Sequence, residues 1–490
     1  MSKSLPTLIA LALLVVSGCT LAPRYHRPAA SISPAWPRVP GYAPTPTNSA
    51  PVPAADIGWR DFFRDARLQQ LIGLALTNNP NLRAAVFTVE QTRAQYHVQA
   101  SALVPVVDID ANGQRERIPN VFGAGGKAFT YSEYSVDLGV TSYELDLFGQ
   151  VRSLKKQALE TYFASVEARK SAQIALVADV AEAYLTERQA TEQLAVAHDL
   201  LNAARQNYDL TRRSFEGGVL SQIDLDAAAT ALQTARVAVA AYIQQLAEAR
   251  DNLVLLIGQP LPANLPAPAP FNPRLCLSDI PPGLPSDLLE RRPDVLEAEH
   301  TLKAANANIG AARAAFFPTI TLTGSGGTAS TELQNLFAPG SQTWAISPQL
   351  NWPIFDAGTA IYELKASRAA ERIDVANYQS AVQTAFRETS DALAVRATVQ
   401  TQLEANQSLV DSDEKTYELT EAGFRGGVNS ALDVLTTQQA LDTARQNLIV
   451  SKYARLTSLI NLYQALGGGW LENSPQPAAT SQNETSAQSQ

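Results

Sequence analysis

Cysteine, histidine and basic residues are all scarce in this sequence of 490 residues. Only Cys19 and Cys276 occur, so if one of them is modified no internal disulfide can form and stability must come from packing. The 47 acids outnumber the 38 lysines and arginines, and a net charge of −9 without any basic cluster argues against nucleic acid as a partner. The histidines lack the spacing of metal ligands; they are His26, His97, His198 and His300.

Catalytic motifs are also missing. Residues 125–128 (GGKA) are similar to a P-loop, but Val121 and Ala128 stand where that motif needs a glycine and a Ser or Thr. No G-x-S-x-G surrounds Ser325, and the paired acids Glu297 and Glu299 lie in a helical run where we expect them to be solvated. The sequence therefore predicts a protein that is not an enzyme and that needs no metal or cofactor.

No apolar run is long enough to span a bilayer as a helix, which takes roughly 20 residues. The run Leu8–Val16 fits the core of a secretory signal instead. It ends in Val16-Ser17-Gly18-Cys19, which resembles a bacterial lipobox, so residues 1–18 would be removed and Cys19 acylated. The alternative is an ordinary signal whose cleavage site merely contains a cysteine. Thr20 is not the Asp that retains such lipoproteins at the inner membrane, so sorting to the outer membrane is implied by analogy.

The chain contains an internal duplication. Residues 208–236 and 417–445 align without gaps and share 14 of 29 residues, including a Gly-Gly-Val corner. Upstream, Asn79-Pro80-Asn81-Leu82 matches Arg292-Pro293-Asp294-Val295. We therefore predict two similar halves rather than an array of short repeats. The expected segments are a signal (1–18), a lipidated leader (19–63), a first repeat (64–257), a Pro-rich linker (258–285), a second repeat (286–466) and a disordered tail (467–490).

Each half reads as a helix, a β-hairpin and a long helical hairpin. Pro80 and Pro293 suit the first turn of a helix, and period-two alternation then predicts strand hairpins at about 105–146 and 318–353, with Gly-rich loops at 123–126 and 324–327. The strands have one apolar and one polar face. The polar residues are Asp108, Asp110, Asp137, Thr321, Thr323 and Gln349.

Two proline-free segments follow these hairpins, from about residue 148 to 215 and from 355 to 424, and some 65 helical residues would make a rod of about 100 Å. The Gly-Gly corners then reverse the chain, with Ser221 and Ser430 as N-caps of the returning helices. Leucines, valines and alanines on the helix after the first corner form an a/d seam. Each corner is thus predicted to be the tip of a long antiparallel coiled hairpin.

Four strands beside a lipid anchor raise the question of how they meet a membrane. Strands are tolerated in lipid only in a closed barrel, and about eight are the practical minimum. Four per chain would have to be pooled between chains, and a trimer would supply twelve. The polar face would line a water-filled lumen, the apolar face would meet lipid, and the long hairpins would curve into a hollow cylinder.

Specific motifs make the chain similar to the TolC/OprM-type outer-membrane efflux proteins, most of all to their NodT-like lipoprotein branch. The motifs cover nearly the whole mature chain; they are GCTLAPRYHRP (18–28), WRDFFRDARLQQLIGLALTNNPNL (59–82), YELDLFGQVR (143–152), LPSDLLERRPDVLEAE (284–299), FFPTITLTG (316–324), PIFDAG (353–358) and the two Gly-Gly corners. Arg24 departs from the pattern, because many relatives carry an acidic residue there.

This resemblance implies a fold class and partners. The fold would be a membrane β-barrel joined to a long α-helical barrel and closed as a homotrimer. The protein would be the outer-membrane channel of a tripartite efflux pump, completed by a periplasmic adaptor and an inner-membrane transporter of the RND type. It would conduct small molecules passively, use no fuel, and extend from the outer membrane into the periplasm. The choice of exported compounds would reside mostly in the inner-membrane partner.

The resemblance also assigns residues at the periplasmic end. Asp433 and Asp224 would line the closing aperture, and three copies of an acid would form a ring that favours cations. A structural alternative is that both acids only complement their helix dipoles. Thr436 stands where some relatives have a second acid, so the resemblance does not extend to a double ring of acids. The residues that would contact the adaptor are Gly217, Gly218, Val219, Gly426, Gly427 and Val428.

Two other functions stay open. The same scaffold could be the outer channel of a type I protein secretion system, which the genes beside it would reveal. It could also be a structural envelope lipoprotein that does not conduct, although such a protein would not need the alternating strands.

Overall fold

The structure is a computed structural model, and it describes residues 20–29, 32–36, 53–121, 127–272, 275–277, 280 and 285–475. The predicted signal, Cys19, the predicted loop at 123–126 and residues 476–490 lie outside this range. The chain divides into two compact units. Unit 1 comprises residues 1–29, 88–166 and 297–379, and unit 2 comprises residues 30–87, 167–296 and 380–490.

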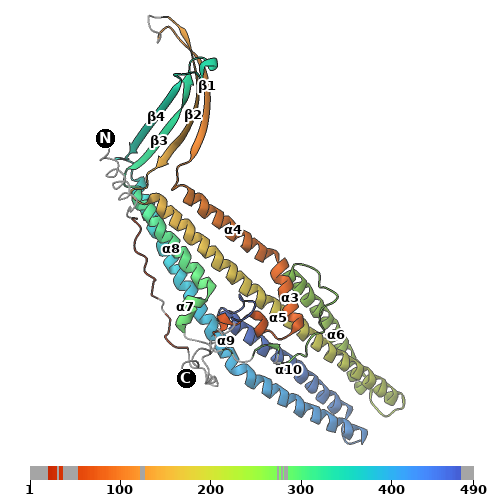
Figure 1. The fold of residues 1–490 in the computed structure, drawn as a ribbon. Coiled ribbons are helices and arrows are strands. Elements are labelled where there is room, and N and C mark those ends of the chain that lie inside the picture. Colours follow the sequence, from red (N-terminus) through yellow and green to blue (C-terminus); the bar gives the residue numbers. More distant parts are fainter. Residues whose placement is uncertain are drawn as a thin grey trace, which may run out of the picture. The chain divides into compact units, whose positions relative to one another are not determined.

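Long helices and one four-stranded sheet make up most of the described chain (Figure 1). In the described part of the chain, no helix combines the length and the apolar composition that crossing a membrane requires. The helices are α2 (Trp59–Phe62), α3 (Ala66–Asn78), α4 (Pro80–Ser101), α5 (Gln150–Glu216), α6 (Gln222–Ile257), α7 (Leu288–Arg291), α8 (Pro293–Ala314), α9 (Thr359–Arg425) and α10 (Ala431–Ala465); the strands are β1 (Val107–Ile118), β2 (Phe129–Glu144), β3 (Thr319–Ser330) and β4 (Gln342–Asn351).

The strands of unit 1 form one antiparallel sheet in the order β1-β2-β3-β4 (Figure 1). Both predicted hairpins are present, and pairing of β2 with β3 joins them into a single sheet. Directly opposed residues share a face of an antiparallel sheet. Asp110 opposes Asp137, and Ile109 opposes Leu138. The register therefore places the predicted polar set on one face and the apolar set on the other.

The predicted Gly-rich loop at 324–327 is wrong, because these residues lie inside β3. A side chain on Gly327 would collide with the Val136 carbonyl and with Asp137 of β2, so glycine is required there by the close approach of the neighbouring strand. Composition alone does not distinguish this cause from a turn. The connection between β3 and β4 comes later and contains a short 3-10 helix, Leu333–Asn335.

The expectation that Glu299 is solvated is also wrong. Its side chain is 3% exposed and accepts hydrogen bonds from the N-terminal leader: 3.1 Å from the Tyr25 hydroxyl, and 3.2 and 2.8 Å from the Arg27 guanidinium. Lys303, one turn further along α8, lies 3.1 Å from the same carboxylate. Nearer the start of the leader, Ala22 packs against Gly310 of α8, where any larger side chain would collide with it. Unit 1 therefore holds residues 20–29 against α8.

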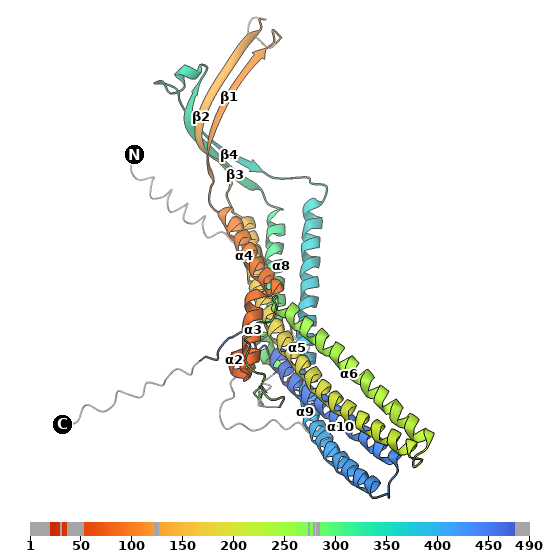
Figure 2. The ribbon, with the colours of Figure 1, turned by 90° about the vertical axis from the view of Figure 1, so that its right-hand side faces the viewer.

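The long helices of unit 2 pair as predicted, α5 with α6 and α9 with α10 (Figure 2). Between α5 and α6 the seam buries alanines and branched residues, namely Ala197, Leu201, Ala204, Leu232, Ala235 and Val239. The α9–α10 seam buries Val410, Leu441, Ala444 and Leu448. Small residues at every second seam position allow two helices to approach closely, so burial rather than helix propensity holds these rods together.

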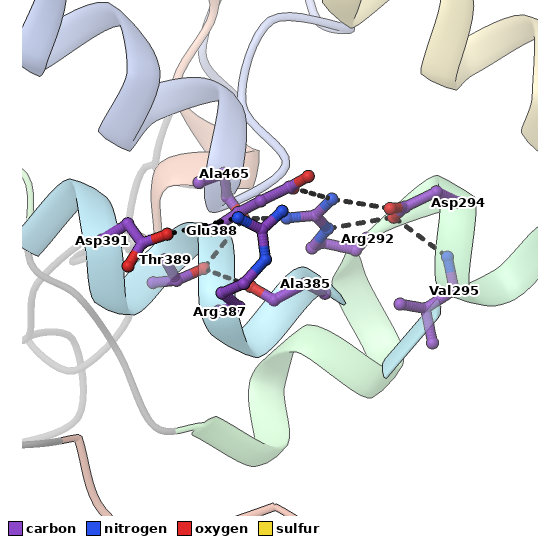
Figure 3. Close-up of polar contacts among 9 residues, drawn as sticks. All are labelled: Arg292, Asp294, Val295, Ala385, Arg387, Glu388, Thr389, Asp391 and Ala465. Carbon is purple, nitrogen blue, oxygen red and sulfur yellow. Dashed lines mark hydrogen bonds and ion pairs between the residues drawn. The ribbon is translucent and has the colours of Figure 1, made fainter. Parts of the chain in front are cut away.

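The repeated N-P and R-P motifs anchor the returning helices at their ends. The Asn79 side chain, just before α4, donates to the Leu256 carbonyl of α6 at 2.8 Å. Arg292, just before α8, donates to the Ala465 carbonyl of α10 at 3.0 Å and also binds Asp294 and Glu388 (Figure 3). Pro80 and Pro293 follow directly as the first residues of their helices. The motif therefore supplies both a helix start and a tie to the end of the hairpin.

The prediction of a disordered tail from residue 467 is wrong for its first nine residues. Tyr463 stacks on Phe62 with ring centroids 4.0 Å apart, and the chain that follows pairs with residues near α2. The Trp59 amide donates to the Leu471 carbonyl at 2.9 Å, and Ser474 donates to the Asp61 carboxylate at 2.6 and 2.7 Å. Residues 467–475 are thus held against unit 2 by hydrogen bonds rather than forming a free tail, and only Gly467, Gly468 and Gly469 among them are buried.

Candidate functional site

The two Gly-Gly corners have the same backbone structure. Gly218 and Gly427 have φ angles of 75° and 76°, in the left-handed region that favours glycine. In each corner the amide three residues after the helix donates back across the last turn, from Val219 to the Ser214 carbonyl and from Val428 to the Gly423 carbonyl, both at 2.8 Å. This is the Schellman arrangement. The glycines that the two corners share therefore produce the same reversal of the chain in both.

Asp224 and Asp433 close capping boxes in the first turns of α6 and α10. Oδ2 of Asp433 accepts from the Ser430 amide at 2.9 Å and from its hydroxyl at 2.7 Å, while the Asp433 amide donates to the Ser430 hydroxyl at 3.2 Å. Asp224 makes the same contacts with Ser221. These hydrogen bonds lower the pKa of both carboxyl groups. Both acids are charged at neutral pH, and the predicted N-caps are confirmed.

The capping role leaves part of each carboxylate available. Among the described residues, none donates a hydrogen bond to Oδ1 of Asp224 or Asp433. Each acid therefore holds its helix start with one oxygen and presents the other, still charged, to solvent. Such an arrangement can attract a cation while it serves as a cap, so the structural role and the aperture role are compatible.

The two corners lie at the same end of unit 2 (Figures 1 and 2). A cavity of about 60 Å³ lies between them, and Asp224 lines it together with the first residues of α10. The other lining residues are Asn207, Thr211, Ile223, Ala227, Ala228, Ala431, Leu432 and Leu435. The fold thus brings one predicted aperture acid, Asp224, beside the start of the helix that carries the other, Asp433.

The tips also expose apolar side chains. Val219 is 79% exposed and Val428 is 83% exposed, and both were predicted to contact a partner. Ile223 and Leu432, at matching positions in the repeat, are 79% and 61% exposed and were not predicted. The signal that could have revealed them is the recurrence of a large apolar residue just before the capping acid in both copies. Together the four side chains make an apolar rim beside the charged caps.

The corners differ in one detail. In the second corner Asn429 folds back and donates from its side chain to the Thr420 carbonyl at 3.2 Å, over Gly423, where any side chain would collide with it. The first corner has Leu220 and Ser214 at these positions. The second tip is therefore tied by one more hydrogen bond than the first.

Two other predictions, lipidation of Cys19 and the lack of a metal site, concern parts of the chain outside these tips. Cys19, the predicted lipidation site, lies outside the described residues. Among the residues that the structure does describe, no group of three or more His, Cys, Asp or Glu side chains is placed to hold a metal ion.

The comparisons with known proteins agree with this architecture. A family model described as outer membrane efflux protein matches residues 71–259 and 284–468. The toluene efflux pump outer membrane protein TtgC of Pseudomonas putida is 46% identical over 476 residues, which cover 97% of this chain and 98% of TtgC. Outer membrane protein OprJ of Pseudomonas aeruginosa is 39% identical over 459 residues, which cover 94% of this chain and 95% of OprJ.

Solved structures show the same fold. The open state of the Neisseria gonorrhoeae MtrE outer membrane channel is similar with a TM-score of 0.85 and 36% identity, covering 93% of this chain and 100% of that one. A membrane protein from Pseudomonas aeruginosa has a TM-score of 0.84 and 38% identity, covering 92% and 100% of the two chains. The four-stranded sheet, the paired helical hairpins and these matches along both repeats lead to one conclusion: the chain belongs to the outer membrane efflux protein family and is a transport protein of the outer membrane.

Proposed function

We propose that the chain is the outer-membrane channel of a tripartite efflux pump and works as a homotrimer. The observation that carries this proposal is the two-faced sheet. Its apolar face suits lipid and its polar face suits water, yet within the described residues β1 and β4 each pair on one side only. Unpaired strand edges are costly in lipid, and three copies of four strands would remove them by closing a twelve-strand barrel.

The hairpin tips supply the proposed contact with a periplasmic adaptor. Exposed apolar residues beside a rigid reversal are what a protein partner can bury, and Val219, Ile223, Val428 and Leu432 have that character. An inner-membrane transporter of the RND type would complete the pump, and acylated Cys19 would anchor the leader in the outer membrane. The names of relatives mention toluene and antibiotics, which supports small organic molecules as the exported class.

The test is a mass measurement combined with electrical recording. Purified protein in detergent should have the mass of three chains, and it should conduct ions when it is inserted in a planar bilayer. A water-soluble monomer, or a trimer without conductance, would overturn the proposal. The first outcome would remove the shared barrel, and the second would favour a structural lipoprotein.

The aperture role of Asp433 can be separated from its capping role. Asp433→Asn removes the charge but keeps an acceptor for Ser430, whereas Asp433→Ala removes both. If Asp433 belongs to a ring of acids, both variants should weaken cation preference or cation block while the trimer persists. Asp411→Asn, which removes an exposed acid from α9 14 residues before Arg425, is the matched control. Unchanged cation preference in Asp433→Asn would refute the aperture role.

A further inference from the structure

A second face of α10 packs against α5 and so joins the two hairpins of unit 2. The Gln446 side chain donates to the Gln193 carbonyl at 3.4 Å, and the hydroxyls of Tyr453 and Thr186 lie 3.3 Å apart. Nearer the tips, Leu435 lines the same cavity as Asn207 and Thr211. Leu435, Gln446 and Tyr453 are eleven and seven residues apart, close to whole helical turns, so they share one face of α10.

Asp442 lies on this face, seven residues after Leu435 and four before Gln446. Its Oδ2 is buried and receives no hydrogen bond from any residue that the structure describes. The nearest basic group on its own helix, Arg445, is turned to Glu414 of α9 at 2.7 Å. A carboxylate therefore lies in the seam between two hairpins without a dedicated partner.

The surroundings of Asp442 offer little compensation for a negative charge. On α9, Tyr417 interacts electrostatically with Asp442, and its ring packs against the apolar cluster of the second hairpin. The α5 residues between Gln193 and Asn207 that can titrate or carry charge are all exposed. The charged or titratable groups that interact with Asp442 are Arg445 on its own helix and Tyr417 on α9, and the exposed groups on the α5 stretch opposite are His198, Asp199 and Arg205.

Burial raises the pKa of Asp442 to about 6, and Arg445 opposes this shift only in part. The first copy of the repeat has no buried acid at this position, because the residue of α6 that matches Asp442 is Gln233, which has no charge and is exposed. The acid is thus a property of the second hairpin alone. Its protonated form suits the closed seam, and its ionised form suits a seam that admits water.

We propose that Asp442 is a proton-controlled latch between the α5–α6 and α9–α10 hairpins. When the carboxyl is neutral, α5 and α10 stay in contact; when it loses its proton, the contact loosens and the tips separate. This inference rests on the proposed function in one respect, namely that separated tips correspond to a wider periplasmic aperture.

The direction of the effect follows from linkage. A carboxyl whose pKa is higher in the closed seam than in water favours the closed form at low pH, and this preference is lost as the pH rises from about 4 through about 6. If ionisation of Asp442 were fully coupled to opening of the seam, the ratio of closed to open chains would change about 100-fold over the whole titration. Because solvent reaches part of Asp442, we expect about tenfold.

Spin labels can measure the separation directly. Cysteines introduced at Leu210 of α5 and Gln439 of α10, both exposed, would carry the labels, and labelled chains would be diluted into unlabelled trimers so that only distances within one chain are recorded. Between pH 5 and pH 7.5, which covers the upper half of this titration, the ratio of separated to closed wild-type chains should rise about threefold. Asp442→Asn should remain closed at both pH values, and Asp442→Gln, which copies Gln233, should do the same.

Two matched controls identify the group responsible. Glu418→Gln removes an exposed acid next to Tyr417, and His198→Gln removes the histidine on the α5 stretch opposite. Both should keep the wild-type response. The latch is refuted if Asp442→Asn keeps the pH response or if His198→Gln abolishes it. A pH response in distance without any conductance would support the latch and refute the channel, so the two proposals fail separately.

Discussion

Replacing Glu299 should release the N-terminal leader from unit 1. In Glu299→Ala the Tyr25 hydroxyl loses its acceptor at 3.1 Å, and Arg27 loses two contacts, at 3.2 and 2.8 Å. Removing one partner of a fully buried pair costs about 3–5 kcal/mol. Here Arg27 is 40% exposed and Lys303 is 26% exposed, so water can solvate both cations after the change. We therefore expect a loss of about 2 kcal/mol, which is roughly a 30-fold rise in the detached population.

Trypsin can report this detachment, because the bond after Arg24 lies inside the leader and the bond after Arg27 is protected by Pro28. In detergent at neutral pH, cleavage after Arg24 should be about 30-fold faster in Glu299→Ala than in the wild-type chain if detachment precedes cleavage. Mass spectrometry over a time course would give the rate. Glu90→Ala, which removes an exposed acid from α4, should leave the rate unchanged.

The pH dependence of the leader gives a further check on this reasoning. Burial alone would raise the pKa of Glu299, but hydrogen bonds from Arg27 and Lys303 outweigh it and lower the pKa. The stabilisation is therefore complete above the ordinary glutamate pKa and is lost as the pH falls through the lower folded value. Wild-type cleavage should approach that of the variant only in acid, measured with an acid-stable protease. Equal cleavage of the two proteins at neutral pH would refute the clamp.

Three further changes test other parts of the fold. Gly427→Ala forces a residue with a side chain into a left-handed backbone conformation and should lower the free energy of unfolding by about 1 kcal/mol. Gly426→Ala, at a position without a positive φ, should have a smaller effect. Equal effects of the two variants in urea unfolding would contradict this. Arg292→Met should cost about 1 kcal/mol, because it removes a donor from the part-exposed Asp294 and Glu388 carboxylates and from the Ala465 carbonyl, which keeps its hydrogen bond from Thr389. Arg292→Lys should recover part of this loss, and a neutral Met variant would argue against the tie. Burial raises the pKa of the Cys276 thiol to about 12, so a maleimide at pH 8 should label it only after denaturation. One labelled thiol per denatured chain supports acylated Cys19, and two refute it.

The sequence predicts the hairpins and corners well, because their causes are local. Pro80 and Pro293 mark helix starts through their missing amide hydrogen, and Gly218 and Gly427 mark reversals through their backbone freedom. Alternation along the strands also predicts which residues share a face. These signals act over a few residues, so a pattern in one segment is enough to detect them.

The residues that sequence reasoning missed depend on distant partners. Glu299 is buried because Arg27 reaches it from 272 positions away, and Gly327 belongs to a strand because β2 passes close to it. Asp442 looks like an ordinary helical acid until α5 is placed against its face. Local propensity carries no information about such contacts, and in each case the charge or the missing side chain has meaning only once the neighbour is known.

The one-sided pairing of β1 and β4 has a genetic consequence. In the proposed trimer, the edge strand β4 of each subunit would pair with the edge strand β1 of the next. A single defective edge strand would therefore prevent the barrel from closing even when the other two subunits are normal. A variant damaged only along β4 should then act as a dominant-negative when it is co-expressed with the normal chain, because the yield of intact rings falls with the cube of the normal fraction. A lesion confined to one hairpin tip leaves the ring closed and should be recessive for assembly.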